Sequence, residues 1–202
     1  MDITFPSMSS SATPNSSGLV TDFVKINAPF SKLFKSKSFN GLFSKKLSPK
    51  IKRIFSSPEI FKNMVGEFLG YSDWKLVTQK EINDFASATE DFQWIHVNEK
   101  KAATESPFKN TIAHGYYSLS LIPKFVYEVW ECKSLKLVLN YGTDKIRFIS
   151  PVICNNQIRA AISVLDAKDY KGGVLLTSKI NIEIKNSEKP ALSAETLSLL
   201  FS

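Results

Sequence analysis

The chain has 202 residues, enough for one domain of ordinary size with a full hydrophobic core. Apolar residues make up 43% and charged residues 22%, as in soluble globular proteins, and no apolar run approaches the ~20 residues of a membrane span. With two cysteines and two histidines in no cluster, composition excludes a zinc finger, an iron–sulfur site and a disulfide scaffold. Reduced thiols favour a cytoplasmic location.

The net charge of +7 is concentrated in the first part of the chain. Residues 1–60 contain nine Lys or Arg and three Asp or Glu, whereas residues 61–202 contain 17 and 16. The rest of the chain is therefore almost neutral, and we do not expect it to bind its ligands mainly through long-range attraction to polyanions. We expect no nucleic-acid partner.

Residues 1–56 read as a basic, partly disordered N-terminal extension. Residues 7–18 are mostly Ser, Thr, Pro, Asn and Gly, whereas residues 23–55 set Phe, Leu and Ile at helical spacing among lysines. Two interpretations stay open: a linker or tail packed loosely on the body, and a peripheral arm over residues 20–56 that contacts a membrane or an acidic surface. A signal peptide fits badly, because Asp2 stands at the start and no uninterrupted apolar core follows, whereas a transit peptide stays open.

The first half of the body, which we place at residues 57–202, has the pattern of helices joined by loops. We expect helices at 57–70, from 78 to about 88, from Asn98, and at 115–130, with a short strand at 74–78. Thr78 and Glu81 form a capping box at the start of the second helix. The helix at 115–130 is the most apolar, and Pro123 should bend it.

The last third changes to the pattern of strands. Val, Ile and Leu dominate five runs separated by Gly, Pro and Asn, at residues 135–141, 145–149, 157–166, 174–184 and 191–201. This predicts an antiparallel meander. Together with the apolar helix it gives an α+β fold in which the sheet wraps one central helix.

Two polar clusters stand out because a purely structural chain would not need them. Asp91 and His96 lie five residues apart in a loop, and His114 and Gly115 stand at the start of the apolar helix. A carboxylate and an imidazole that share one water form a general acid/base pair. Free N–H groups at the helix start suit a thioester carbonyl that becomes enolate-like. From the residues alone, an Asp–His pair in a loop is more often a local hydrogen bond or a helix cap.

The wider pattern resembles the MaoC-like dehydratase family, the (R)-specific enoyl-CoA hydratases of the hotdog fold. The resemblance covers about residues 72–201 and rests on three motifs in order, Asp91-Phe-Gln-Trp-Ile-His96, Thr111-Ile-Ala-His-Gly115 and Asn140-Tyr-Gly with Lys145-Ile-Arg-Phe148. The Gln-Trp-Ile-His form is most similar to the NodN-like branch. Where the family often has two glycines before the Ala-His-Gly motif, this chain has Lys109-Asn110-Thr111.

The resemblance implies a single hotdog domain, a homodimer and a set of site residues. It implies that Asp91 and His96 are catalytic, and that Gly115, with His114 and Ser120, binds substrate and polarises the thioester carbonyl. Ser118 is an alternative to Ser120 as the supporting helix serine. The substrate carrier would be CoA or acyl carrier protein, with no metal and no other cofactor.

Three functions follow from these expectations. The first is a hydro-lyase of fatty acid metabolism, an (R)-specific enoyl-CoA hydratase or 3-hydroxyacyl thioester dehydratase that uses the Asp91–His96 pair. The second is a hotdog acyl thioesterase, in which a carboxylate activates water against the thioester carbonyl. The third is a non-catalytic protein that binds acyl thioesters.

Overall fold

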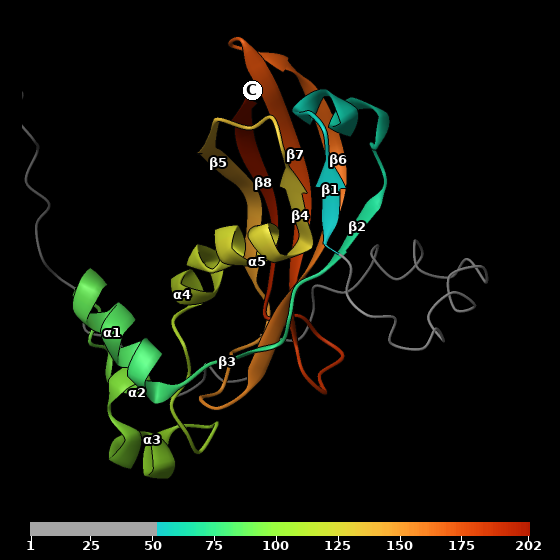
Figure 1. The fold of residues 1–202 in the computed structure, drawn as a ribbon. Coiled ribbons are helices and arrows are strands. Elements are labelled where there is room, and N and C mark those ends of the chain that lie inside the picture. The colour runs from blue at the N-terminus through green and yellow to red at the C-terminus, as the bar shows by residue number, and fades with distance from the viewer. Residues whose placement is uncertain (1–51) are drawn as a thin grey trace, which may run out of the picture. The chain divides into compact units, whose positions relative to one another are not determined.

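Figure 1 shows the fold in a computed structural model, which describes residues 52–202. The predictions made for residues 1–51, including most of the basic arm, lie outside the described residues and stay predictions. The described part contains a 3-10 helix and five α-helices: η2 (Pro58–Asn63), α1 (Gln79–Thr89), α2 (Trp94–Val97), α3 (Glu99–Glu105), α4 (Gly115–Ser120) and α5 (Ile122–Val129). Its strands are β1 (Arg53–Phe55), β2 (Phe68–Tyr71), β3 (Lys75–Leu76), β4 (Trp130–Cys132), β5 (Leu137–Phe148), β6 (Gln157–Tyr170), β7 (Gly173–Ile184) and β8 (Leu192–Phe201).

The main sheet has six strands and is antiparallel, in the order β2-β6-β7-β8-β5, with β3 also paired to β6. The predicted α+β class and antiparallel sheet are therefore confirmed. The meander is correct only for β6, β7 and β8, because β5 pairs with β8 at the far side of the sheet and not with β6. The strands expected at 135–141 and 145–149 are also one strand, β5. Its ladder with β8 continues past Gly142 through two register shifts, so β-bulges replace the expected break.

The helix expected at 57–70 is wrong beyond Asn63. The 3-10 helix ends there, the chain turns through Gly66 at φ 88°, and Phe68–Tyr71 becomes strand β2 beside β6. The apolar spacing misled the prediction because both the helix and the strand place side chains in the same core: Phe61 is fully buried and Leu69 is 3% exposed. Pairing with the long strand β6 decides the backbone.

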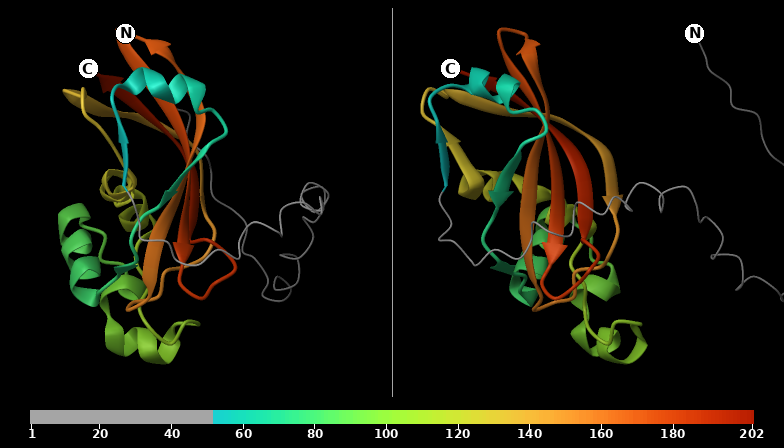
Figure 2. Two further views of the ribbon diagram at one scale, coloured as in Figure 1. Left: turned by 45° about the vertical axis from the view of Figure 1, so that its right-hand side comes forward. Right: turned by 90° about the vertical axis from the view of Figure 1, so that its right-hand side faces the viewer.

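The central helix is divided into two. α4 ends at Ser120, and α5 begins at Ile122 with Pro123 in its first turn. The predicted bend at Pro123 is thus a break between two short helices, because proline has no N–H to continue the ladder and suits a first helical turn. Figure 2 shows these helices on one side of the curved sheet. Phe125 of α5 is fully buried in the core that it shares with Ile162 and Ile180.

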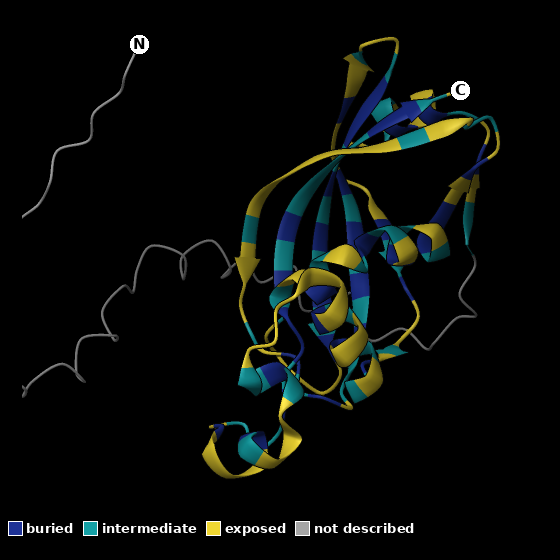
Figure 3. Ribbon diagram, turned by 90° about the vertical axis from the view of Figure 1, so that its left-hand side faces the viewer, coloured by how far each residue is buried: buried dark blue, intermediate teal, exposed yellow. Residues whose placement is uncertain are grey.

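Burial follows the period of two that the strands predict. Alternate residues of β6 and β7 are buried, whereas β5 is exposed along most of its length (Figure 3). β1 pairs in parallel with β4, so Arg53–Phe55 join the body although they precede the expected boundary at residue 57. Among the helices that the structure describes, none is long and apolar enough to cross a membrane.

Candidate active site

Asp91 follows directly after α1, where the chain leaves the helix. Glu90 caps α1 in the left-handed region at φ 59°, and Asp91 then turns the chain back by accepting the N–H of Gln93 on Oδ1 at 3.3 Å. α2 begins at Trp94, in a segment where the sequence predicts only a loop. This short helix carries His96 inward, and the side chain of Asp91 stays half-exposed at 55%.

His96 is held in one tautomer. It is 8% exposed, and its Nδ1 lies 2.7 Å from the carbonyl oxygen of Ile112. A carbonyl only accepts, so Nδ1 carries the hydrogen and Nε2 keeps a free lone pair. Burial lowers the pKa of His96 below its usual value, against the opposing effect of the Ile112 hydrogen bond. The imidazole is therefore neutral and ready to accept a proton at neutral pH.

His114 lies behind this pair and contacts both members. Its ring stacks on that of His96 with centroids 3.8 Å apart and planes 29° apart, and Phe85 packs beside it at 5.1 Å. Nε2 donates to the backbone carbonyl of Asp91 at 3.0 Å and lies 3.9 Å from its carboxylate. His114 is 3% exposed, so it braces the two residues without lining the cavity described below.

The three side chains form a compact group of nitrogen and oxygen atoms. One such atom from each of Asp91, His96 and His114 lies within 4.8 Å of the others. Groups of this kind are able to hold a metal ion, and a carboxylate beside an imidazole is also able to transfer protons.

A network around His96 fixes its backbone. Gln79, at the start of α1, donates from Nε2 to the carbonyl oxygen of His96 at 2.8 Å, and its Oε1 accepts the hydroxyl of Thr111 at 2.5 Å. Ile112 donates its N–H to the carbonyl of Ile95, and Ala113 donates to that of Val152. Sequence reasoning did not find Gln79 or the Ile112 carbonyl, because neither a capping-turn glutamine nor a backbone carbonyl carries a signal.

Gly115 opens α4 and borders a cavity of about 260 Å³. A side chain at position 115 would meet the ring of Phe148, since an added Cβ would lie 2.8 Å from it. Glycine therefore allows the β5 strand to approach the helix start. The cavity is lined by His96, Ile112, Ala113, Gly115, Ser118, Phe148, Ile149, Ser150, Pro151, Val152 and Ala191.

The two serines proposed for the site face different places. Ser118 is 2% exposed and lines the cavity beside His96 and Gly115. Ser120 donates its hydroxyl to the carbonyl of Tyr116 at 2.5 Å and borders a separate, larger cavity. The structure thus brings Asp91, His96, His114 and Gly115 together and adds Ser118, but it does not bring Ser120 to them.

Comparison with known proteins fits this arrangement. Residues 61–185 match the model of the MaoC like domain. The 3-hydroxyacyl-thioester dehydratase Z of Mycobacterium tuberculosis is 41% identical over 72% of this chain and 96% of its own length. Nodulation protein N of Rhizobium leguminosarum is 39% identical over 67% and 86%.

The fold has a match among solved structures as well. The R-hydratase PhaJ1 of Pseudomonas aeruginosa superposes with a TM-score of 0.54 at 22% identity, over 68% of this chain and 82% of that one. This likeness supports the hotdog arrangement of sheet and helix. The match to the family model and the similarity to its relatives go further, and the chain belongs to the MaoC-like dehydratase family.

Proposed function

We propose that this protein is a hydro-lyase that adds water reversibly across the double bond of a trans-2-enoyl thioester. One observation carries the proposal. A neutral His96, whose Nε2 is unprotonated, lies in one group with the Asp91 carboxylate and borders the cavity at Gly115. A base and a carboxylate beside a helix start are the groups that this reaction requires.

The reaction needs only proton transfer and charge stabilisation. His96 Nε2 takes a proton from a water that Asp91 orients, and the hydroxide adds to C3 of the substrate. The electron pair of the double bond moves toward the thioester and gives an enolate-like state. The imidazolium then returns a proton to C2, so that the atoms of one water are added and the site regains its initial charge. Dehydration is the same path in reverse.

Gly115 has the role of stabilising the enolate-like oxygen. The first N–H groups of α4 have no acceptor within the helix, and residue 115 carries no side chain to obstruct a thioester. His114 is a positioning residue in this proposal, because it holds the ring of His96 and the backbone of Asp91. The similarity to the Mycobacterium tuberculosis 3-hydroxyacyl-thioester dehydratase Z supports the same reaction class. We expect the product to have (R) stereochemistry.

An assay with crotonyl-CoA tests the proposal against the other two functions. Hydration removes the enoyl absorbance without releasing thiol, and the product should be (R)-3-hydroxybutyryl-CoA by chiral chromatography. A thioesterase would release free CoA instead, which a thiol reagent detects. Binding of the thioester with neither change would leave a non-catalytic binding protein and would refute the hydro-lyase.

We further propose a symmetric homodimer. Strand β5 is the last strand of the sheet, and its other edge pairs with no described strand. It is 12 residues long and leaves Leu137, Leu139 and Tyr141 exposed. A long apolar edge strand is a site for pairing with another chain. Light scattering should give twice the chain mass at micromolar concentration, and Leu139→Lys should shift it toward the monomer.

The remaining expectations concern the cellular setting. A role in fatty acid metabolism, a cytoplasmic location and CoA or acyl carrier protein as the carrier stay predictions of the sequence. The same holds for the contact of residues 20–56 with a membrane or an acidic surface. Comparing crotonyl-CoA with its acyl carrier protein thioester would decide the carrier directly.

A further inference from the structure

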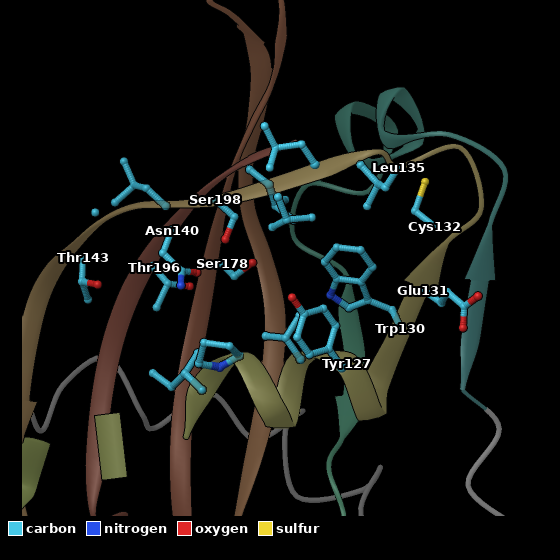
Figure 4. Close-up of a pocket in the computed structure, with 18 of the residues that line it drawn as sticks. Tyr127, Trp130, Glu131, Cys132, Leu135, Asn140, Thr143, Ser178, Thr196 and Ser198 are labelled. Carbon is cyan, nitrogen blue, oxygen red and sulfur yellow. The ribbon is translucent and has the colours of Figure 1, made fainter. Parts of the chain in front are cut away.

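A second and larger cavity, of about 860 Å³, lies between α5 and the strands β5 and β8. We call it the α5–β5 cavity. Its volume is within the range of sites that hold small molecules. Figure 4 shows that its two sides differ: hydroxyl and amide groups gather on the sheet side, whereas Tyr127 and Trp130 stand on the helix side.

The polar groups form one patch on the sheet. Five side chains come from three neighbouring strands, and strand register brings them together. Ser178 of β7 pairs with Thr196 of β8, which pairs with Thr143 of β5; one step along, Ser198 pairs with Asn140. All five residues line the α5–β5 cavity. We call these five residues the polar patch.

The polar patch interrupts a face that is otherwise apolar. Alternate residues of β7 on this face are Val174, Leu176, Ser178, Ile180, Ile182 and Ile184. On β8 the corresponding run is Leu192, Ala194, Thr196, Ser198 and Leu200. Three strands therefore turn polar at the same place, which scattered surface serines would not produce.

No partner within the described chain explains these polar groups. None of the five side chains makes a hydrogen bond to another side chain or backbone group in residues 52–202. Ser178 is 6% exposed, yet its hydroxyl is not fully buried and opens onto the cavity. A hydroxyl that contacts cavity water is available to a ligand, and a ligand that reproduces the hydrogen bonds of that water is favoured over one that cannot.

The opposite wall indicates the rest of the ligand. It consists mainly of apolar groups from α4, α5, β4, the loop that follows β4 and the start of β5: Leu119, Ile122, Val126, Trp130, Leu135 and Val138. The indole N–H of Trp130 is the exception, since it is buried without a partner in the described residues. A molecule in this cavity meets hydrocarbon on one side and hydrogen-bonding groups on the other. An aliphatic chain that carries hydroxyl or keto groups has both surfaces.

α4 connects this cavity to the catalytic one. Ser118 lines the catalytic cavity, and the next two residues, Leu119 and Ser120, line the α5–β5 cavity. The two cavities also border the same strand, at Thr143 and at Phe148. An acyl chain whose thioester lies at Gly115 can therefore extend along α4 and β5 into the α5–β5 cavity.

We propose that the α5–β5 cavity receives the acyl chain of the substrate and selects chains that carry a hydroxyl or keto group away from the thioester. This inference rests on the proposed function, since it names the substrate class of that reaction. The polar patch would supply hydrogen bonds to the oxygen of the chain, and the apolar wall would contact its methylene groups.

The test compares matched substrates on the full chain. The kcat/KM of hydration is measured for trans-2-octenoyl-, decenoyl- and dodecenoyl-CoA and for the ω-hydroxy and keto forms of each. We expect an oxygenated substrate to exceed its plain counterpart about tenfold at one chain length or more. Plain substrates that turn over equally well at every length would overturn the proposal and leave the hydratase intact.

Variants then assign any preference to the polar patch. Ser178→Ala and the isosteric Thr196→Val should abolish it. Ser163→Ala and Thr177→Val are the matched controls, because their positions on β6 and β7 place them on the other face of the sheet, and they should retain it. Melting temperature and mass of each variant are recorded. If only those variants that have become monomeric by mass lose the preference for oxygenated chains, the patch is an interface between two copies of the chain. That result would refute the assignment.

Two further arms separate the remaining outcomes. N-acetylcysteamine thioesters of the same acids lack most of the carrier arm. One outcome is that the patch variants lower kcat/KM equally for plain and oxygenated CoA thioesters and leave it unchanged for the N-acetylcysteamine thioesters. In that case the patch contacts the carrier, and the proposal is wrong. If no enoyl thioester is hydrated, the proposed function fails. Binding of saturated hydroxydecanoyl-CoA against decanoyl-CoA by calorimetry then still tests the cavity, and equal affinities refute it.

Discussion

The two cavities differ in how many of their polar side chains bond to the backbone, although one atom of the catalytic group, His114 Nδ1, is buried without a partner in the described residues. Around the catalytic cavity, the Nδ1 of His96, the Nε2 of His114 and the Oδ1 of Asp91 each have a backbone partner at 2.7–3.3 Å. In the α5–β5 cavity the five polar side chains have none within the described chain. Groups that perform chemistry have to be held in position before the substrate arrives, whereas groups that select a ligand remain available to it.

The largest expected effect concerns the two groups that act on the water. Asp91→Asn and His96→Ala should each lower kcat for enoyl-CoA hydration by about 10²–10⁴, the contribution of a general acid or base. Because the two groups act on one water, the double variant should lose little more than either single one. Steady-state kinetics with crotonyl-CoA checks this, and full activity in either single variant would remove the mechanism.

A smaller loss is expected where the backbone approaches the substrate. In Gly115→Ala the new methyl group would lie 2.8 Å from the ring of Phe148, so β5 and the start of α4 have to separate. We expect kcat to fall by about 10–100-fold, less than the loss of a complete oxyanion-hole donor. Phe148→Leu in the same chain should restore part of the rate. A Gly115→Ala variant with unchanged kcat would show that the close approach does not matter for catalysis.

How far sequence could predict this molecule depends on the kind of feature. The Thr78–Glu81 capping box and the strands at 157–166, 174–184 and 191–201 were predicted correctly, because each depends on local residue types. The family resemblance added the hotdog arrangement and is confirmed by the match at residues 61–185. The catalytic roles themselves stay predictions.

The features that were missed depend on contacts between distant segments. The segment that forms β2 has apolar residues at helical spacing, and only its pairing with β6 makes it a strand. The tautomer of His96 is set by a carbonyl 16 residues away, which has no sequence signal. The polar patch does have a sequence signal, because Ser178 is the only polar residue among the alternate positions from 174 to 184. The signal points to a patch only once the strand register places Ser178 beside Thr196.

A variant of His114 tests whether its hydrogen bond to the Asp91 carbonyl matters for catalysis or only for stability. His114→Phe keeps an aromatic ring beside His96 and removes the hydrogen bond to the Asp91 carbonyl. We expect kcat to fall about tenfold, which corresponds to one hydrogen bond. Burial is the main cause of the lowered pKa of His96, and the electrostatic effect of His114 lowers it further, so without the His114 imidazole the acid limb of the pH–rate profile should move to higher pH.

Phe85→Leu is the control for that prediction. Phe85 packs beside His114 without a hydrogen bond to it, so this variant should lower the melting temperature and leave the acid limb in place. If both variants change only the melting temperature, His114 has a structural role and is not a positioning residue.

The lowered pKa of His96 also predicts how stability depends on pH. Its folded pKa lies below the reference value of 6.5, mainly because of burial, so the unfolded chain binds more protons near and below pH 6.5. The free energy of unfolding should therefore fall as pH decreases from 6.5 through the folded pKa, by at most about 1.4 kcal/mol per pH unit for one proton. Urea unfolding of the wild type and of His96→Gln measures the difference, and equal slopes would contradict the assignment.

The smallest effect is expected from the N-terminal extension. Asp91, His96 and Gly115 all lie in the described part, so deletion of residues 1–51 should change kcat/KM for crotonyl-CoA by less than about twofold. The same deletion should abolish any salt-sensitive binding to anionic liposomes, because lysines near such a surface contribute about 1 kcal/mol each.

A second deletion, of residues 1–56, sharpens this prediction. It also removes β1, which pairs with β4, and Phe55, which packs against Phe61 and Trp130. We expect the melting temperature to fall by several degrees in this deletion and to stay unchanged in the shorter one. If the shorter deletion already lowers it, residues 1–51 stabilise the body, and the peripheral-arm interpretation should be dropped in favour of a tail packed on the fold.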